Sequence, residues 1–134
     1  MAAMEDLSSR FWSELRKRNR LMAGDRADRL KFEAADFPAL DEVDELVRAE
    51  APDTIAVLVE LAETAPDEEG LAAMAAGPVS EVLYFHAIPF LVDIEAASRK
   101  SPKFRTVLKL AFWGWSGIPD SVRTKLEPLL EPGL

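Results

Sequence analysis

Residues 101–115, SPKFRTVLKLAFWGW, carry the clearest helical pattern in the chain. Their apolar members recur at intervals of three or four and so share one face of a helix: Phe104, Val107, Leu108, Ala111, Phe112 and Trp115. Ser101 and Pro102 suit its cap and first turn, because a serine hydroxyl accepts a backbone N–H and proline lacks one. The pattern predicts a buried helix that needs partner helices on its apolar face.

Similar start and stop signals for helices occur on both sides of this segment. Proline near helix starts and glycine near helix ends divide the chain into short helices. The predicted helices span about residues 5–20, 38–50, 52–65, 67–76, 78–88, 88–100, 101–115 and from 119 onwards. Short loops between consecutive helices favour antiparallel hairpins. We therefore predict an all-α fold of seven or eight short helices, as an irregular bundle or a HEAT-like stack.

The chain is expected to form one domain, because 134 residues can bury about two-thirds of the surface that the unfolded chain exposes. Residues 1–32 are interpreted as a basic N-terminal helix followed by a connector, and residues 33–134 as the helical core. The first helix has an apolar residue at every fourth position: Leu7, Phe11 and Leu15. It is therefore amphipathic, with a basic outer face. Trp12, beside Phe11, suits either the core or a surface.

Charge is strongly segregated along the chain, whose net charge is −8. From Glu33 to Glu95 there are sixteen acidic residues and one basic residue, Arg48, whereas both flanking segments are basic. Such a single-sign field attracts basic partners and repels nucleic acid and anionic membranes. We expect the basic first helix to lie against the protein's own acidic middle, which neutralises part of both.

Composition also bears on compartment. The chain has no cysteine, which fits a reducing environment. No apolar run approaches the roughly 20 residues of a membrane span, and Glu5 and Asp6 do not suit the basic start of a signal peptide. These features favour a cytoplasmic protein that does not enter a membrane.

Several short motifs taken together resemble a known pattern: Ala75–Pro78, His86, Ile94–Glu95, Ser101–Arg105 and Trp113–Asp120. In this order they resemble an uncharacterised family of small all-helical bacterial domains of unknown function. The resemblance covers roughly residues 43–126. It implies the helical fold and carries over no activity, cofactor or site residue.

His86 is the one histidine, and Val79, Val82, Leu83 and His86 are spaced to lie on one helical face. The simplest interpretation is a core histidine that hydrogen-bonds a backbone carbonyl, Glu81 or Glu95. The alternative is a small enzyme or ligand-binding domain with a pocket built by Glu81, His86 and Glu95. With no cysteine and no second histidine, a metal site would depend mostly on carboxylates, so neither a metal nor another cofactor is expected.

The leading hypothesis is a non-enzymatic domain whose acidic face binds a basic protein partner, of the kind a bacterial immunity or antitoxin protein neutralises in a toxin. The candidate binding residues are acidic groups of two predicted helices: Asp41, Asp44, Glu45, Asp67, Glu68 and Glu69. Trp113 and Trp115 are further candidates, because exposed tryptophan often contributes strongly to interfaces. A third possibility is a structural adaptor or homo-oligomer built through these tryptophans.

Overall fold

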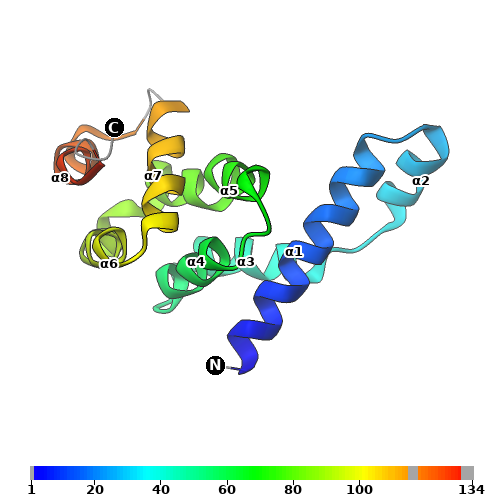
Figure 1. Ribbon diagram of the computed structural model, residues 1–134, viewed down its shortest axis with the longest axis horizontal. Coiled ribbons are helices and arrows are strands. Elements are labelled where there is room, and N and C mark those ends of the chain that lie inside the picture. The colour runs from blue at the N-terminus through cyan, green and yellow to red at the C-terminus, as the bar shows by residue number, and fades with distance from the viewer. Residues whose placement is uncertain (1, 115–117, 131–134) are drawn as a thin grey trace.

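The computed structural model describes the backbone of residues 2–114 and 118–130, with side chains from Asp6 to Phe112 and from Ile118 to Leu130. Within these residues there are helices and no strands, so the predicted all-α fold is confirmed. The elements are α1 (Ala2–Met22), α2 (Arg26–Ala34), α3 (Pro38–Arg48), α4 (Thr54–Glu63), α5 (Glu68–Met74), the π-helical turns η1 (Ala75–Val79) and η2 (Val82–His86), α6 (Ala87–Lys100), α7 (Pro102–Gly114) and α8 (Asp120–Leu130). Figure 1 shows their arrangement.

Helix α7 lies at the centre of the body of the protein, where it contacts α4, α5, η1, α6 and α8. The apolar residues that predicted it are buried: Phe104, Val107, Leu108 and Ala111. Its N-terminus is capped as expected, since the Phe104 backbone N–H donates to Ser101 Oγ at 3.1 Å. The sequence pattern therefore identified the helix around which the others pack.

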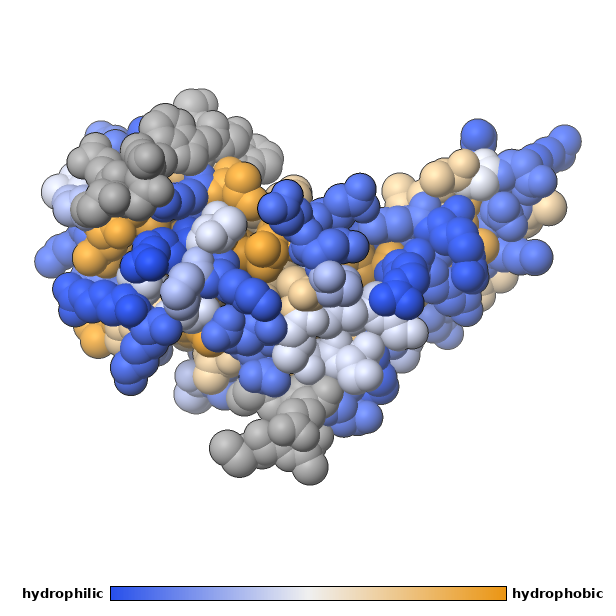
Figure 2. Space-filling model, in the orientation of Figure 1, coloured by the Kyte–Doolittle hydropathy of each residue, from blue (hydrophilic) through white to orange (hydrophobic). Residues whose placement is uncertain are grey.

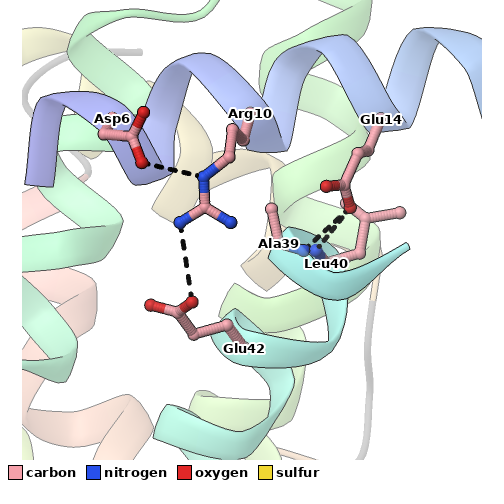
Figure 3. A network of polar contacts seen from close by, with 6 residues as sticks. All are labelled: Asp6, Arg10, Glu14, Ala39, Leu40 and Glu42. Carbon is pink, nitrogen blue, oxygen red and sulfur yellow. Dashed lines mark hydrogen bonds and ion pairs between the residues drawn. The ribbon is translucent and has the colours of Figure 1, made fainter. Parts of the chain in front are cut away.

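Helix α1 packs against α3 and α4 through its apolar face. Leu7, Phe11, Trp12 and Leu15 join the same hydrophobic core as the residues of α7. The Trp12 indole N–H donates to Thr64 Oγ1 at 3.2 Å, which settles this tryptophan as a core residue. Charge also joins α1 to the acidic middle, since Arg10 lies 3.7 Å from Glu42 (Figure 3).

A second polar contact fixes the start of α3. The N-cap position, Phe37, has no side chain able to accept the free N–H groups there. Glu14 of α1 takes this role: its Oε1 accepts the backbone N–H of Ala39 at 2.8 Å and of Leu40 at 3.2 Å (Figure 3). A carboxylate also complements the partial positive charge of a helix N-terminus. Glu14 is therefore a cap supplied from another helix.

We expect Glu14→Ala to lower the free energy of unfolding by about 1–2 kcal/mol, because it leaves two partly buried N–H groups without an acceptor. Urea denaturation measures the change. Glu14→Gln is the matched control: it keeps an acceptor oxygen and should lose less than half as much. Equal stability of Glu14→Ala and the wild type would contradict the capping role.

The prediction of a connector after the first helix is wrong, because residues Arg26–Ala34 form α2. Asp25 caps this helix by accepting the Asp28 N–H at 3.0 Å. Helix α2 packs on α1, buries none of its nine residues fully, and forms with α1 a hairpin that projects from the body (Figure 1). We call residues 16–34 of this hairpin the arm. Figure 2 shows hydrophilic residues over most of its visible face, with apolar residues between them.

The chain from Glu68 to Lys100 forms one continuous helical run with a kink at Gly77, where a stop and restart was predicted. By length and composition this run could cross a membrane, with a mean hydropathy of 1.3 in its most apolar window. Within the fold, 44% of that window is buried. The core helices of other proteins share this length and composition, so these properties alone do not indicate a membrane span.

Candidate functional site

Two prolines shape the helical run. Pro78 lies inside η1, and Pro89 follows η2 by three residues. Proline cannot donate a backbone hydrogen bond, and its ring displaces the carbonyl four residues earlier. A π turn takes an extra residue at such a point, and π turns are common at functional sites. Ser80 partly compensates, because its hydroxyl donates to the Ala75 carbonyl.

The π turns change which side chains face the core. The backbone is non-helical at Gly77 in η1 and at His86, where η2 meets α6, so the helix faces before and after these residues are not continuous. Val79, Val82 and Leu83 are buried as predicted. Beyond them, three large apolar side chains of the run are exposed: Phe85, Ile88 and Val92, with exposed fractions of 72%, 61% and 80%. We call these three residues the apolar stripe.

A groove of about 460 Å³ adjoins the stripe at Phe85. Its wall consists of small and aromatic residues with one carboxylate: Ala76, Gly77, Ser80, Glu81, Tyr84 and Phe85. A methyl group built on Gly77 would meet no atom of the described residues within 4 Å, so this part of the groove is open. The groove and the stripe together form a mostly apolar surface that can receive a side chain from outside.

Carboxylates border the groove. Burial raises the pKa of Asp44 above its ordinary value, and the charge of Glu81 raises it further, while Arg48 and Arg18 act in the opposite direction. Asp44 of α3 and Glu81 of the groove therefore lie close enough to repel one another. A cation from a binding partner at this position would relieve that repulsion.

The raised pKa of Asp44 predicts a pH-dependent cost to folding. A carboxyl group with a raised pKa in the folded state binds its proton more tightly there than in the unfolded state. Its contribution to stability is therefore fully present below the unfolded pKa and is lost as pH rises through the raised pKa, where the ionised group opposes folding. We expect Asp44→Asn to be slightly more stable than the wild type at pH 7, with the difference vanishing below about pH 4. Thermal unfolding at both pH values tests this. A variant less stable than wild type at pH 7 would contradict the sign.

The predicted acidic residues fall into two groups. Asp41 and Glu45 are exposed on α3, and Asp44 is half-buried beside Glu81. Glu45 also lies 3.8 Å from Arg48 of the same helix. Of this first group, Asp44 is linked to the groove, because the charge of Glu81 in the groove wall acts on it.

The second group, Asp67, Glu68 and Glu69, lies at the start of α5. Asp67 has a structural role as the N-cap, since its Oδ1 accepts the Gly70 N–H at 2.8 Å. Asp67 and Glu69 line a small cavity together with Arg16 of α1. These acids therefore lie beside a basic residue of the arm, whereas Asp44 of the first group is linked to the groove.

His86 forms a different contact from the one predicted. Its Nδ1 lies 2.8 Å from Glu50 Oε2, so the expected hydrogen-bond partners Glu81 and Glu95 are wrong. Glu81 lies in the groove, and Glu95 is 4.0 Å from Arg99. The structure thus places the three members of the predicted alternative pocket in separate interactions.

Glu50 occupies an unusual backbone position. Its φ of 51° lies in the left-handed region that glycine usually fills at the end of a helix. The N–H groups of Glu50 and Ala51 bond the carbonyls of Val47 and Leu46, which closes the end of α3. Because this position holds glutamate and not glycine, the Glu50 side chain can contact His86 and so join the end of α3 to the end of η2. No pattern in the sequence indicated this pair.

Comparison with protein families identifies the family of the chain. Residues 26–130 match the profile of DUF6869, a family of unknown function. The chain belongs to this family. The DUF6869 match includes α2, the groove and the apolar stripe, and begins after α1. Comparisons with curated proteins and with solved structures found no match. The resemblance to an uncharacterised family is confirmed, and the DUF6869 description adds no activity.

The predicted partner contacts of the two tryptophans and the question of a metal site remain for this DUF6869 chain. The side chain of Trp113 and the whole of Trp115 lie outside the described residues. Among the residues that the structure does describe, no three histidine or acidic side chains are grouped so that they could hold a metal ion.

Proposed function

We propose that this chain is a protein-binding domain that receives a basic and apolar segment of a partner on the groove and the apolar stripe. The exposure of Phe85, Ile88 and Val92 close together in the chain carries this proposal. Large apolar side chains gathered on a surface lose contact with water when a partner covers them, which favours binding.

The charges around this surface indicate the partner's chemistry. Glu81 lines the groove, its charge acts on Asp44 of α3, and Asp93 is exposed next to Val92 on α6. An apolar segment with lysine or arginine on its flanks would cover the stripe and pair with these carboxylates. Complementary charge speeds association and rejects acidic partners.

The most specific form of this proposal is an immunity or antitoxin-type protein that neutralises a basic toxin. The net charge of −8 supports this form, because fast capture of a cationic protein benefits from a strong opposite field. In this reading the domain has no chemistry of its own and acts by covering its partner.

The test is capture of partners from a native lysate with three chains: the wild type, Glu81→Lys with Asp93→Lys, and Glu68→Lys with Glu69→Lys. The second and third chains carry the same charge change at different places. We expect one basic protein, bound at equal stoichiometry, which the groove variant loses and the α5 variant keeps. Toxicity of that protein when expressed alone, relieved by this chain, would support the immunity form. Loss in the α5 variant alone would contradict the groove as the site.

A further inference from the structure

Helix α2 carries a surface that resembles the partner segment just described. Its outward face has Leu30, which is 58% exposed, with the exposed residues Ala27 and Ala34 beside it at spacings of three and four. Arg26 and Lys31 lie on the two sides of this apolar row, at about 40° and 100° from Leu30 around the helix axis. Helix α2 therefore presents an apolar ridge with Arg26 and Lys31 on its two sides and the exposed Glu33 on the same side as Arg26.

The apolar stripe shows the opposite arrangement on α6. Ile88 and Val92 are four residues apart and exposed on one face of a regular α-helix. Asp93 and Glu95 lie on the two sides of this row, by the same helical geometry. Glu95 also lies 4.0 Å from Arg99 of the same helix. The ridge of α2 and the stripe of α6 thus have matching apolar centres and mostly opposite charges on their borders.

These two surfaces cannot meet within one chain, because α2 lies at the end of the projecting arm and α6 lies in the body, at opposite ends of the molecule (Figure 1). We propose that α2 of one copy docks through Leu30 on the apolar stripe of a second copy. The proposal rests on the function above, since it fills the same surface, and it names an occupant that the chain itself supplies.

The contact joins two different surfaces, so it is head-to-tail and produces a ring or an open chain of copies. A nine-residue helix covers less area than the roughly 1,200–2,000 Å² of a stable interface. The association should therefore be weak, with a dissociation constant of about 10 µM or above, and a tighter basic partner would displace the arm.

Two features of the molecule favour a second copy over other occupants. First, α2 is a capped helix that buries none of its residues fully, and docking would cover its exposed leucine. Second, the carboxylates around the stripe repel the anionic surface of a membrane. The test below also includes the two other possible occupants, a basic partner helix and a membrane.

Sedimentation equilibrium over a range of concentrations tests self-association of the full chain. The wild type should show an average mass that rises with concentration. Two variants should each weaken the association at least tenfold: Arg26→Glu with Lys31→Glu, and Asp93→Arg with Glu95→Arg. The chain carrying all four changes should regain it, because the charges are again complementary. Leu30→Asp should abolish association in every background, with an unchanged circular dichroism spectrum.

A monomeric wild type at all concentrations would overturn the proposal, as would self-association that survives Leu30→Asp. A parallel titration separates this failure from failure of the proposed function. The probe is a short helical peptide of leucine, alanine and lysine. If the chain is monomeric but this peptide binds the stripe, the self-docking idea alone fails. A monomeric chain that binds vesicles of phosphatidylcholine and phosphatidylglycerol through the stripe would replace the second copy with a membrane.

Discussion

A fragment that begins at Arg26 and lacks α1 is expected not to fold, although it contains all the residues that match the family profile. Helix α1 supplies four large side chains to the core: Leu7, Phe11, Trp12 and Leu15. Burial of each is worth about 2–3 kcal/mol, so their loss totals about 8–12 kcal/mol. This approaches the whole stability of a typical domain, about 5–15 kcal/mol. The Glu14 cap of α3 would be lost as well.

Circular dichroism and the spread of amide proton shifts in NMR measure this outcome. The fragment should show little helix and collapsed dispersion. A graded version is Trp12→Ala in the full chain, which should cost about 3–5 kcal/mol, whereas Trp12→Phe keeps most of the buried ring area and should lose less. A folded fragment with native-like helix content would show that α1 is an accessory to the domain and would contradict its role in the core.

Substitution of Ile88 and Val92 together by aspartate is expected to weaken binding of a basic amphipathic peptide by about 100-fold or more. The change places two charges in the centre of the contact, and central apolar anchors usually carry at least 2 kcal/mol of binding energy. Stability should change little, because both side chains are exposed in the free chain. Calorimetric titration measures the affinity, and thermal unfolding checks the fold.

The matched control is Leu110→Asp, since Leu110 is another exposed apolar residue, on α7. This change should leave peptide affinity unaltered. Equal loss in both variants would show that the loss is not specific to the stripe and would contradict a site located there.

Periodicity was a good guide wherever packing follows an uninterrupted helix. Phe104, Val107 and Leu108 predicted α7 because their spacing matches the helical repeat, and the structure buries all three. The cap at Ser101 followed from its hydroxyl. Local chemistry of this kind is readable from a sequence because the interacting groups are three or four residues apart.

The candidate site was harder to predict because its parts are brought together by irregular backbone and by distant contacts. The helical run is interrupted at Gly77 and at His86, and Ile88 and Val92 beyond these residues are exposed, which a regular helical pattern cannot show. The pair of Glu50 and His86 joins residues 36 positions apart. Helix α2 was missed because its apolar residues are few and face outward, so no core pattern marked it.

Charge counting predicted a basic partner and placed it on two groups of acids, on α3 and at the start of α5. The sixteen acidic residues of the middle segment are spread over α2, α3, α4, the helical run from α5 to α6 and the loops between them, with different neighbours in each. Asp67 caps a helix, and the charge of Glu81 in the groove wall acts on Asp44. The position of the apolar stripe, rather than the number of acids, distinguishes the two groups.

Titration of the isotope-labelled full chain with the basic amphipathic peptide, followed by NMR, tests the location of the binding surface most directly. We predict that the amide signals that shift most belong to residues 76–93, with Asp44 and its neighbours on α3 also affected. Shifts confined to α5 and the arm, or none at peptide concentrations well above those of the chain, would contradict the account.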